Sequence, residues 1–230
     1  RICRGGFNED DTVVVYTSNY GPTAIAIDNS AGIIYWNDNS SRDIYRSAIS
    51  SDTLSGTEWF SDFANDHVYS ACVGNNGRVY FTVNSYYSNS AALGSGNGGD
   101  VYWGATNSFD SDTQVTSLTG PSADSCPFKG IAVNVAGGHV FFVTYTSNGA
   151  RPKTVTRTNL SLSGTAEWIY LGPSDTSDIH KIALDLVNRK IYWTSQTDNR
   201  LYRADMDTQY PAIELFLSLD SMPTGICISQ

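Results

Sequence analysis

The chain has 230 residues, of which 40% are hydrophobic and 16% charged, and its 14 basic and 23 acidic side chains give a net charge of −9. This negative balance disfavours nucleic acid and anionic membranes as main partners, because long-range repulsion opposes their encounter. Every apolar run is far shorter than the ~20 residues that cross a bilayer, so we expect no membrane insertion. The composition instead predicts a folded chain with a sizeable core.

The chain is built from a repeated unit of short strands. In the first complete unit, strands are predicted over 24–28, 33–38 and 43–46, with a fourth at 58–60. Each run is rich in aromatic and β-branched residues and is separated from the next by Gly, Asn, Asp and Ser, and no window has helical periodicity. Three further copies begin with the strands predicted over 70–74, 130–134 and 181–185.

Four short strands per unit, repeated at a period of roughly 50 residues, are typical of the blades of a β-propeller. We therefore predict an all-β, single-domain propeller of five blades over residues 1–230. First strands begin near Thr23, Tyr69, Lys129, His180 and Thr224. The predicted blades span 23–66, 67–122, 123–177 and 178–220, and a closing blade combines 221–230 with 1–20.

The closing blade draws strands from both ends of the chain. Residues 1–4 align with third strands, 12–16 supply a fourth strand and 224–229 supply the first. The second strand of this blade is missing from the sequence. A ring closed in this way leaves no exposed sheet edge.

Four cysteines are present, an even number that suits two disulfides. Cys3 and Cys227 lie on the third and first strands of the closing blade, which pair directly when the second is absent. Neighbouring strands lie ~4.8 Å apart and bridged Cα atoms ~4.4–6.8 Å apart, so we predict a disulfide between Cys3 and Cys227. By elimination, Cys72 pairs with Cys126; the alternative is that both are free buried thiols.

Secretion is the favoured interpretation of these cysteines, because disulfides persist in oxidising compartments. Asn39 and Asn159 begin the acceptor patterns for N-glycosylation and lie in predicted turns. The chain begins at Arg1 without a signal-like apolar stretch, which indicates a processed mature chain or an excised fragment.

Two second strands carry a family resemblance. Residues 35–38 read Tyr-Trp-Asn-Asp and 192–195 read Tyr-Trp-Thr-Ser, each after an Ile-Ala-Ile/Leu-Asp strand and before a strand that bears arginine. These segments resemble the YWTD repeats of low-density lipoprotein receptor propellers, and 80–83 and 141–144 are degenerate copies. The resemblance implies a propeller fold and a protein-docking role. YWTD propellers have six blades, whereas this sequence supports five. Chain length and blade size are also similar to those of five-bladed invertebrate lectins of the tachylectin type.

Residues that recur at the same position in several blades are expected to serve the fold. Asp28, Asn134 and Asp185 end first strands, where a short acceptor side chain caps the following turn. The repeated tryptophans and arginines suit packing between blades and stacking of guanidinium groups on rings. They are Trp36, Trp193, Arg46, Arg157 and Arg203.

The loops between second and third strands differ among blades and gather on one rim, where a rigid scaffold usually places its binding residues. Their Tyr, Asn, Asp, Ser and Gly content suits a sugar, because a ring stacks on a pyranose while amides and carboxylates meet its hydroxyls. The alternative is a set of solvated flexible loops. The candidate ligand-binding residues are Tyr86, Tyr87, Asn37, Asp38, Tyr145, Asn148, Asp198 and Asn199.

Catalysis is not expected. The chain has three histidines, His67, His139 and His180, and neither a Gly-x-Ser-x-Gly nor a His-Glu-x-x-His segment. A hydrolase would need paired carboxylates in the channel, and no metal or cofactor is predicted. The main hypothesis is therefore a secreted lectin that binds glycans or glycoproteins, with homo-oligomers allowed. The rival is a YWTD-type protein-docking module, which would present a broad exposed patch rather than separate small pockets.

Overall fold

The computed structural model describes an all-β chain. It covers residues 2–4, 13–16, 21–38, 43–50, 56–60, 66–85, 99–106, 129–144, 154–163, 167–171 and 179–228. No helix capable of crossing a membrane occurs within these ranges. The strands form five antiparallel sheets, as the repeat predicts.

Four of the sheets are successive blades, each numbered in chain order from its inner strand to its outer strand. Blade one contains β3 (Ile25–Asp28), β4 (Ile33–Asp38), β5 (Asp43–Ala48) and β6 (Thr57–Phe60). Blade two contains β7 (Asp66–Gly74), β8 (Arg78–Ser85) and β9 (Gly99–Ala105). Blade three contains β10 (Ile131–Asn134), β11 (His139–Thr144), β12 (Thr154–Asn159) and β13 (Glu167–Leu171). Blade four contains β14 (Ile179–Asp185), β15 (Lys190–Ser195), β16 (Arg200–Asp205) and β17 (Glu214–Ser218).

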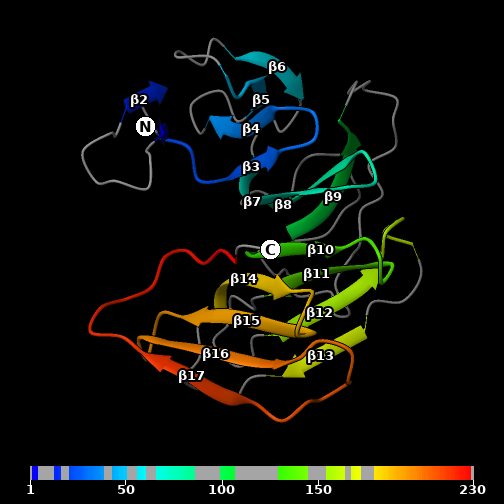
Figure 1. Ribbon diagram of the computed structural model, residues 1–230, viewed down its shortest axis with the longest axis vertical. Helices are drawn as coiled ribbons and strands as arrows, with labels where there is room; N and C mark the ends of the chain where they lie inside the picture. Colours follow the sequence, from blue (N-terminus) through cyan, green and yellow to red (C-terminus); the bar gives the residue numbers. More distant parts are fainter. Residues whose placement is uncertain are drawn as a thin grey trace.

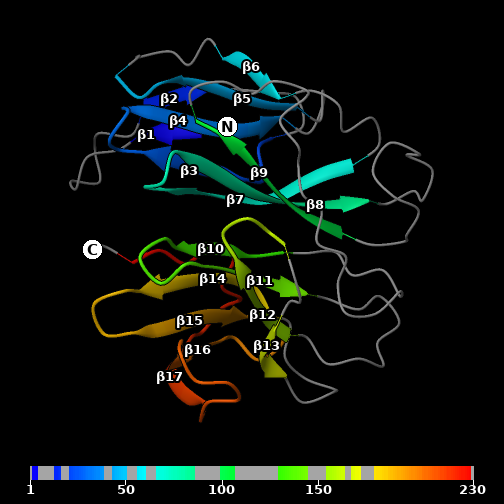
Figure 2. The ribbon, with the colours of Figure 1, turned by 90° about the vertical axis from the view of Figure 1, so that its right-hand side faces the viewer.

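The blades follow one another around a centre, with their first strands innermost (Figure 1). Strand β3 contacts β7, β7 contacts β10, and β10 contacts β14. Strand β17 lies at the outer margin of blade four (Figures 1 and 2). The predicted all-β propeller is thus confirmed, with a fifth sheet made of β1 (Ile2–Arg4) and β2 (Val13–Tyr16).

The closing blade differs from the prediction. Strand β1 pairs with β2, but the described residues 224–228 form no strand beside it. Cys227 is an exposed free thiol, so the predicted disulfide between Cys3 and Cys227 is not formed. The physical reason is that a disulfide needs two backbones held at strand spacing, and no strand holds Cys227 against β1.

The second predicted disulfide is also corrected. Cys72 is a free thiol, which is the alternative that the sequence left open, while Cys126 lies outside the described residues. Cys72 faces Tyr80 across the β7–β8 pair and packs against the apolar cluster between blades two and three. Burial raises the pKa of this thiol, so it stays protonated and behaves as a small hydrophobic side chain.

Three apolar cores hold the described blades together, one at each junction between neighbours. Above each core, side chains of one blade donate to a backbone carbonyl that follows the third strand of the next blade. Tyr35 Oη and Arg46 Nη1 reach Thr106 O at 3.0 and 2.8 Å. Tyr80 Oη and Arg78 Nη1 reach Leu160 O at 3.1 and 2.9 Å, and Arg157 Nη1 reaches Asp207 O at 3.3 Å. Arg46 and Arg157 thus join neighbouring blades, although they bind carbonyls rather than rings, whereas Arg203 contacts Glu214 and Phe216 of its own blade.

The repeated polar residues at the ends of first strands cap turns, as predicted. Asp28 Oδ1 accepts from Ala31 N at 3.0 Å, Asn134 Oδ1 from Gly137 N at 2.9 Å, and Asp185 Oδ1 from Asn188 N at 2.8 Å. Hydrogen bonds to Ser30 and Asn188 lower the pKa values of Asp28 and Asp185, respectively. These carboxylates therefore serve the hairpins and are not free for acid–base chemistry.

Candidate functional site

Asn37, one of the predicted sugar ligands, is a structural residue. Its side chain is buried, with 2% exposed. Oδ1 accepts from Thr23 N at 2.9 Å and Ala24 N at 2.7 Å, while Nδ2 donates to Thr23 Oγ1 at 2.9 Å and to Val68 O at 3.3 Å. Asn37 thereby joins β4 to the start of its own inner strand and to blade two. The polar atoms of Asn37 therefore face the protein, and its role in ligand binding stays a prediction.

The other described candidates do not assemble a sugar pocket. Asp38 is buried. Asp198 accepts a hydrogen bond from Tyr202 Oη through Oδ2, and Asn199 occupies a turn position with φ of 54°. Burial raises the pKa of Tyr202, with the Asp198 bond as the second cause. The remaining candidates, Tyr86, Tyr87, Tyr145 and Asn148, lie outside the described residues.

Of the two predicted glycosylation sites, Asn39 lies outside the described residues. Asn159 is exposed at the end of β12, but its side chain caps a turn. Its Oδ1 accepts from Ser161 N at 3.0 Å and from Ser163 N at 3.1 Å. Glycosylation at Asn159 stays a prediction.

Blade four presents an apolar outer strand that the sequence pattern did not single out. Leu215, Phe216 and Leu217 of β17 are consecutive and all exposed. The pairing of β17 with β16 contains a bulge that leaves Phe216 without a residue opposite it. Trp59 in β6 and Ile169 in β13 occupy the same bulge position in their blades. Phe216 is 49% exposed, whereas Trp59 and Ile169 are 5% and 0% exposed because the following blade covers them. We call residues 214–218 the outer-strand surface.

A charged and aromatic cluster supports the outer-strand surface from the neighbouring strands. Arg203 Nε donates to Glu214 Oε2 at 2.7 Å, and its guanidinium carbon lies 5.2 Å from the ring centroid of Phe216. The Tyr192 ring meets the Phe216 ring edge to face at 5.1 Å. Hydrogen bonding to Arg203 lowers the pKa of Glu214, so the carboxylate stays charged at neutral pH. The surface therefore combines apolar area with a fixed ion pair.

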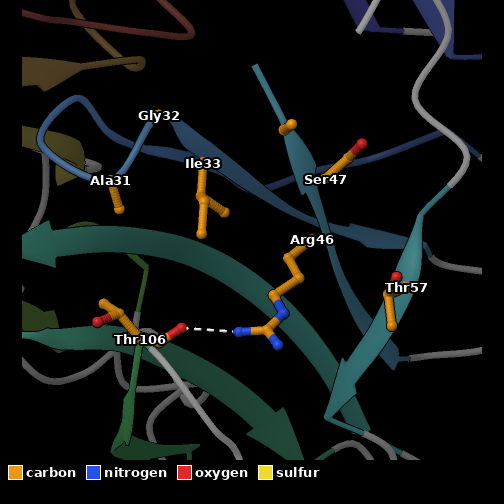
Figure 3. Close-up of a pocket in the computed structure, with 8 residues that line it drawn as sticks. Ala31, Gly32, Ile33, Arg46, Ser47, Thr57 and Thr106 are labelled. Atoms are coloured by element: carbon orange, nitrogen blue, oxygen red, sulfur yellow. Dashed lines mark hydrogen bonds between the residues drawn. The ribbon is translucent and has the colours of Figure 1, made fainter. Parts of the chain in front are cut away.

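A wide open pocket of about 440 Å³ lies at the junction of blades one and two (Figure 3). Arg46 points across it toward Thr106 O, and Ser47 and Thr57 show hydroxyls at its side. Its other lining residues are Ala31, Gly32, Ile33, Ala48 and Thr106, and the guanidinium already serves the contact between blades. The pocket therefore offers little apolar area or free charge to a ligand.

The inner rim, where first strands begin, contains an unusual lysine. Lys181 stands where the other blades have Ala24, Ser70 and Gly130. Its Nζ donates to Tyr69 O of blade two at 2.7 Å, so the side chain reaches past blade three. Burial, with the charge of Lys129 as a second cause, lowers the pKa of Lys181 to about 8. A sequence comparison among the blades could have identified this residue, because it breaks a pattern of small side chains.

The pKa of Lys181 predicts how stability changes with pH. In the unfolded chain its pKa is near 10.5, so between about pH 8 and 10.5 the unfolded state binds more protons than the folded state. Stability contributed by this group therefore rises with pH, by about 1.3 kcal/mol from pH 7 to 9. Above pH 9 the raised pKa of Cys72 acts in the opposite direction, which sets the upper end of the window.

Urea denaturation at pH 7, 8 and 9 measures this effect. Lys181→Met should remove the rise, since methionine has no proton to release. Lys190→Met, at the partly exposed start of β15, serves as the control and should keep the wild-type slope. Identical slopes for wild type and Lys181→Met would contradict the assignment.

Gly130 permits the close approach of β14 at the inner rim. A Cβ at this position would lie 2.9 Å from Ile182 N and 3.0 Å from Lys181 Cα. Because both are backbone atoms, Gly130→Ala should destabilise the protein by about 1–3 kcal/mol in chemical denaturation. Gly225→Ala is the matched control, because a Cβ there meets nothing within 4 Å, and its effect should stay within about 0.5 kcal/mol. Equal losses of stability for both variants would contradict the close contact of Gly130 with the β14 backbone.

Comparison with known proteins places the chain among propellers by structure alone. No family model and no curated protein matches it. A chain of a nidogen/laminin complex matches with a TM-score of 0.73 at 10% identity, covering 95% of this chain and 73% of that one. A gluconolactonase from Xanthomonas campestris (TM-score 0.65, 12% identity) and TolB from Acinetobacter baumannii (0.64, 12%) cover 92% and 96% of this chain. This chain spans 66% of the gluconolactonase chain and 49% of the TolB chain.

These likenesses support the fold. At identities of 10–12% they show a shared fold and no closer relationship. The neighbours include both an enzyme and propellers from other kinds of protein, and therefore do not select one activity for this chain.

Proposed function

We propose that this propeller is a protein-docking module that receives its partner on the outer-strand surface of blade four. The observation that carries the proposal is the exposure of all five residues of β17, three of which are large apolar side chains. A contiguous apolar patch on the surface of a folded protein is a feature of interaction sites. The nidogen/laminin neighbour supports the same class of function.

The chemistry of β17 selects an extended apolar segment of another protein as the partner. This strand is the last in its sheet, so one row of backbone N–H and C=O groups has no strand opposite it in the described fold. Natural edge strands are usually protected by lysine, proline or a bulge, and β17 has one of these features, the bulge at Phe216. Residues 215–217 read Leu-Phe-Leu, with one glutamate before them. A partner strand can add to this edge through main-chain hydrogen bonds while its side chains contact the leucines.

The sugar-binding hypothesis has weaker support. Among its described candidates, Asn37 and Asp38 are buried and Asp198 is engaged with Tyr202. The other candidates, Tyr86, Tyr87, Tyr145 and Asn148, lie outside the described residues, so sugar binding stays a prediction. Secretion likewise stays a prediction from the sequence.

A protein array of extracellular domains, probed with the purified chain, tests the proposal. The variant Leu215→Glu with Leu217→Glu places two charges on the surface and should weaken binding of a genuine partner at least tenfold. Val187→Glu is the matched control, because Val187 is an exposed apolar residue on the β14–β15 turn of the same blade. Its binding should equal that of wild type.

Hydrogen exchange then tests the mode of binding. The amides of β17 that point away from β16 should exchange fast in the free protein and become protected by the partner. Protection in the free protein at low concentration would show that the chain covers its own edge, and concentration-dependent protection would show a second copy. Either result, or a glycan array that is positive while the protein array is negative, would overturn the proposal.

A further inference from the structure

Two isoleucines on the inner strand of blade one are exposed at positions that are covered in blades three and four. Ile25 corresponds to Ile131 and Ile182, because each pairs with the second residue of the aromatic pair on its second strand. Ile25 is 48% exposed, whereas Ile131 and Ile182 are 4% and 6% exposed. Ile27, on the same side of β3, is 45% exposed, and its counterpart Leu184 is 6% exposed. These two side chains of β3 therefore lack a cover that the later blades have.

The cover that β3 lacks is that of a preceding blade. In blades three and four, the corresponding side chains lie in the cores shared with the blade before. Successive side chains of a strand point to opposite faces of its sheet. Ala24 and Ala26 on β3 point into the core with blade two, so Ile25 and Ile27 point to the opposite face. They therefore face the place of the closing blade, which precedes blade one in the ring.

Phe216 on blade four is exposed for the complementary reason. At the junction of blades one and two, the bulge residue Trp59 meets Phe81, on the second strand of the following blade, edge to face at 6.2 Å. At the junction of blades three and four, Ile169 packs in one core with Trp193, again on the second strand of the following blade. Phe216 has the same position and is 49% exposed. It lacks the large side chain that a following second strand supplies at these two junctions.

The described part of the closing sheet leaves this place unfilled. It contains β1 and β2, which correspond to third and fourth strands, and the described residues 224–228 form no strand. The second strand of this blade is missing from the sequence. Inner-strand contacts run from β3 to β7, β10 and β14, and contacts of the same extent do not lead from β14 back to β3. The described ring is therefore short of an inner pair of strands between blade four and blade one.

From these observations we infer that a β-hairpin of a partner protein inserts between blades four and one and supplies the first and second strands of the closing blade. The other junctions define the chemistry of this hairpin. Its second strand carries an aromatic side chain that covers Phe216, as the second strand of blade two covers blade one. Its first strand presents small side chains to Ile25 and Ile27, as Ala132 does in the core with blade four.

The hairpin contacts the face of blade four, whereas the proposed partner strand adds to the edge of β17. Phe216 meets the ring of Tyr192, whose counterpart Tyr35 reaches the following blade. Because Phe216 belongs to the outer-strand surface, the inference rests on the proposed function for that contact and adds Ile25 and Ile27 on blade one. Burial of apolar area drives this insertion, as it does at the three described junctions.

A peptide of residues 130–144 is the probe, because it contains the first and second strands of blade three. Ala132 lies on one face of this hairpin and Phe142 on the other. The fluorescein-labelled peptide is titrated into the full chain at pH 7, and binding is followed by anisotropy. We expect saturable binding that Phe142→Ser or Ala132→Lys in the peptide weakens at least tenfold. Val135→Ser, in the turn of the peptide, is the matched control and should bind like the parent peptide.

Variants of the protein place the hairpin. Ile25→Ser combined with Ile27→Ser should raise the dissociation constant at least tenfold, and so should Phe216→Ser. Val187→Ser is the matched control, because Val187 is an exposed aliphatic residue on the β14–β15 turn, and it should leave binding unchanged. Carbene footprinting of the wild-type complex should show protection at Ile25, Ile27 and Phe216, which keeps the test valid if a variant fails to fold.

Footprinting of the free protein tests the other occupants. Ile25 and Ile27 should react with the carbene when no peptide is present. Protection at low protein concentration would show that residues 224–228 or another part of the chain cover them, and concentration-dependent protection would show a second copy. Either result would overturn the inference. Absence of saturable peptide binding, or equal binding by wild type and the double isoleucine variant, would also overturn it.

The two proposals fail in different ways. If the double isoleucine variant binds the peptide like wild type while a partner from the protein array is lost with Leu215→Glu and Leu217→Glu, the inference fails and the proposed function stands. If the peptide binds through Ile25 and Ile27 while array partners tolerate Leu215→Glu and Leu217→Glu, the inference stands and the proposed function fails.

Discussion

Replacing Phe81 with alanine is expected to lower the free energy of unfolding by about 3–5 kcal/mol. Phe81 on β8 is 0% exposed and lies in the core between blades one and two. Its ring stacks on Tyr102 at 5.6 Å and meets Trp59 edge to face at 6.2 Å. Alanine would leave a cavity lined by rings that belong to two blades and cannot collapse independently.

The matched control is Phe216→Ala, the same substitution at a residue that is 49% exposed. Its cost should stay below about 1 kcal/mol, because little apolar area returns to water. Urea denaturation of both variants at pH 7 gives the comparison. A loss at Phe216 as large as that at Phe81 would show that the outer-strand surface is covered in solution, and would count against its proposed role.

Replacing Asn37 with alanine should cost about 2–4 kcal/mol, because several hydrogen bonds are lost at a buried position. The change leaves the amide groups of Thr23 and Ala24 without Oδ1 as acceptor, and Val68 O without one of its donors. Stability is measured by chemical denaturation. Binding of any glycan or protein ligand to the folded variant should be unchanged, which separates a structural role from a binding role.

Asn188→Ala provides the reference for this prediction. Asn188 is exposed and its side chain bonds only to Asp185 in the β14–β15 turn within the described structure, so its cost should be below about 1 kcal/mol. Asn37→Thr should recover part of the stability, since Thr82 and Thr194 occupy the equivalent positions and donate or accept with inner-strand backbone groups. A stable Asn37→Ala variant that loses ligand binding would restore the predicted role in recognition.

The blades could be predicted from the sequence alone because each blade repeats the same order of strand-forming and turn-forming residues. Short β-branched and aromatic runs separated by turn residues define strands, and residues 35–38 and 192–195 have the same pattern because both must cover a neighbouring blade. The caps at Asp28, Asn134 and Asp185 were equally predictable, since a side chain that binds the backbone three residues later needs only local geometry.

The candidate site could not be predicted in the same way. Asn37 has the chemistry of a sugar ligand, and only the position of Val68 in the next blade shows that its amide is already used. Leu215 and Leu217 look like any strand of the repeat, and their exposure depends on what lies against blade four. The disulfide between Cys3 and Cys227 failed for a similar reason, because it required the ends of the chain to form adjacent strands.

The sequence by itself therefore determined the all-β class, the period of the blades and the turns that separate their strands, since these depend on interactions among residues close together in the chain. Only the tertiary structure decided which polar groups form hydrogen bonds between blades and which outer strand stays exposed. It also decided that Lys181 reaches Tyr69 across the inner rim. The physical reason is that burial and pairing belong to contacts between blades, and strand periodicity within one blade contains no information about the partner it will meet.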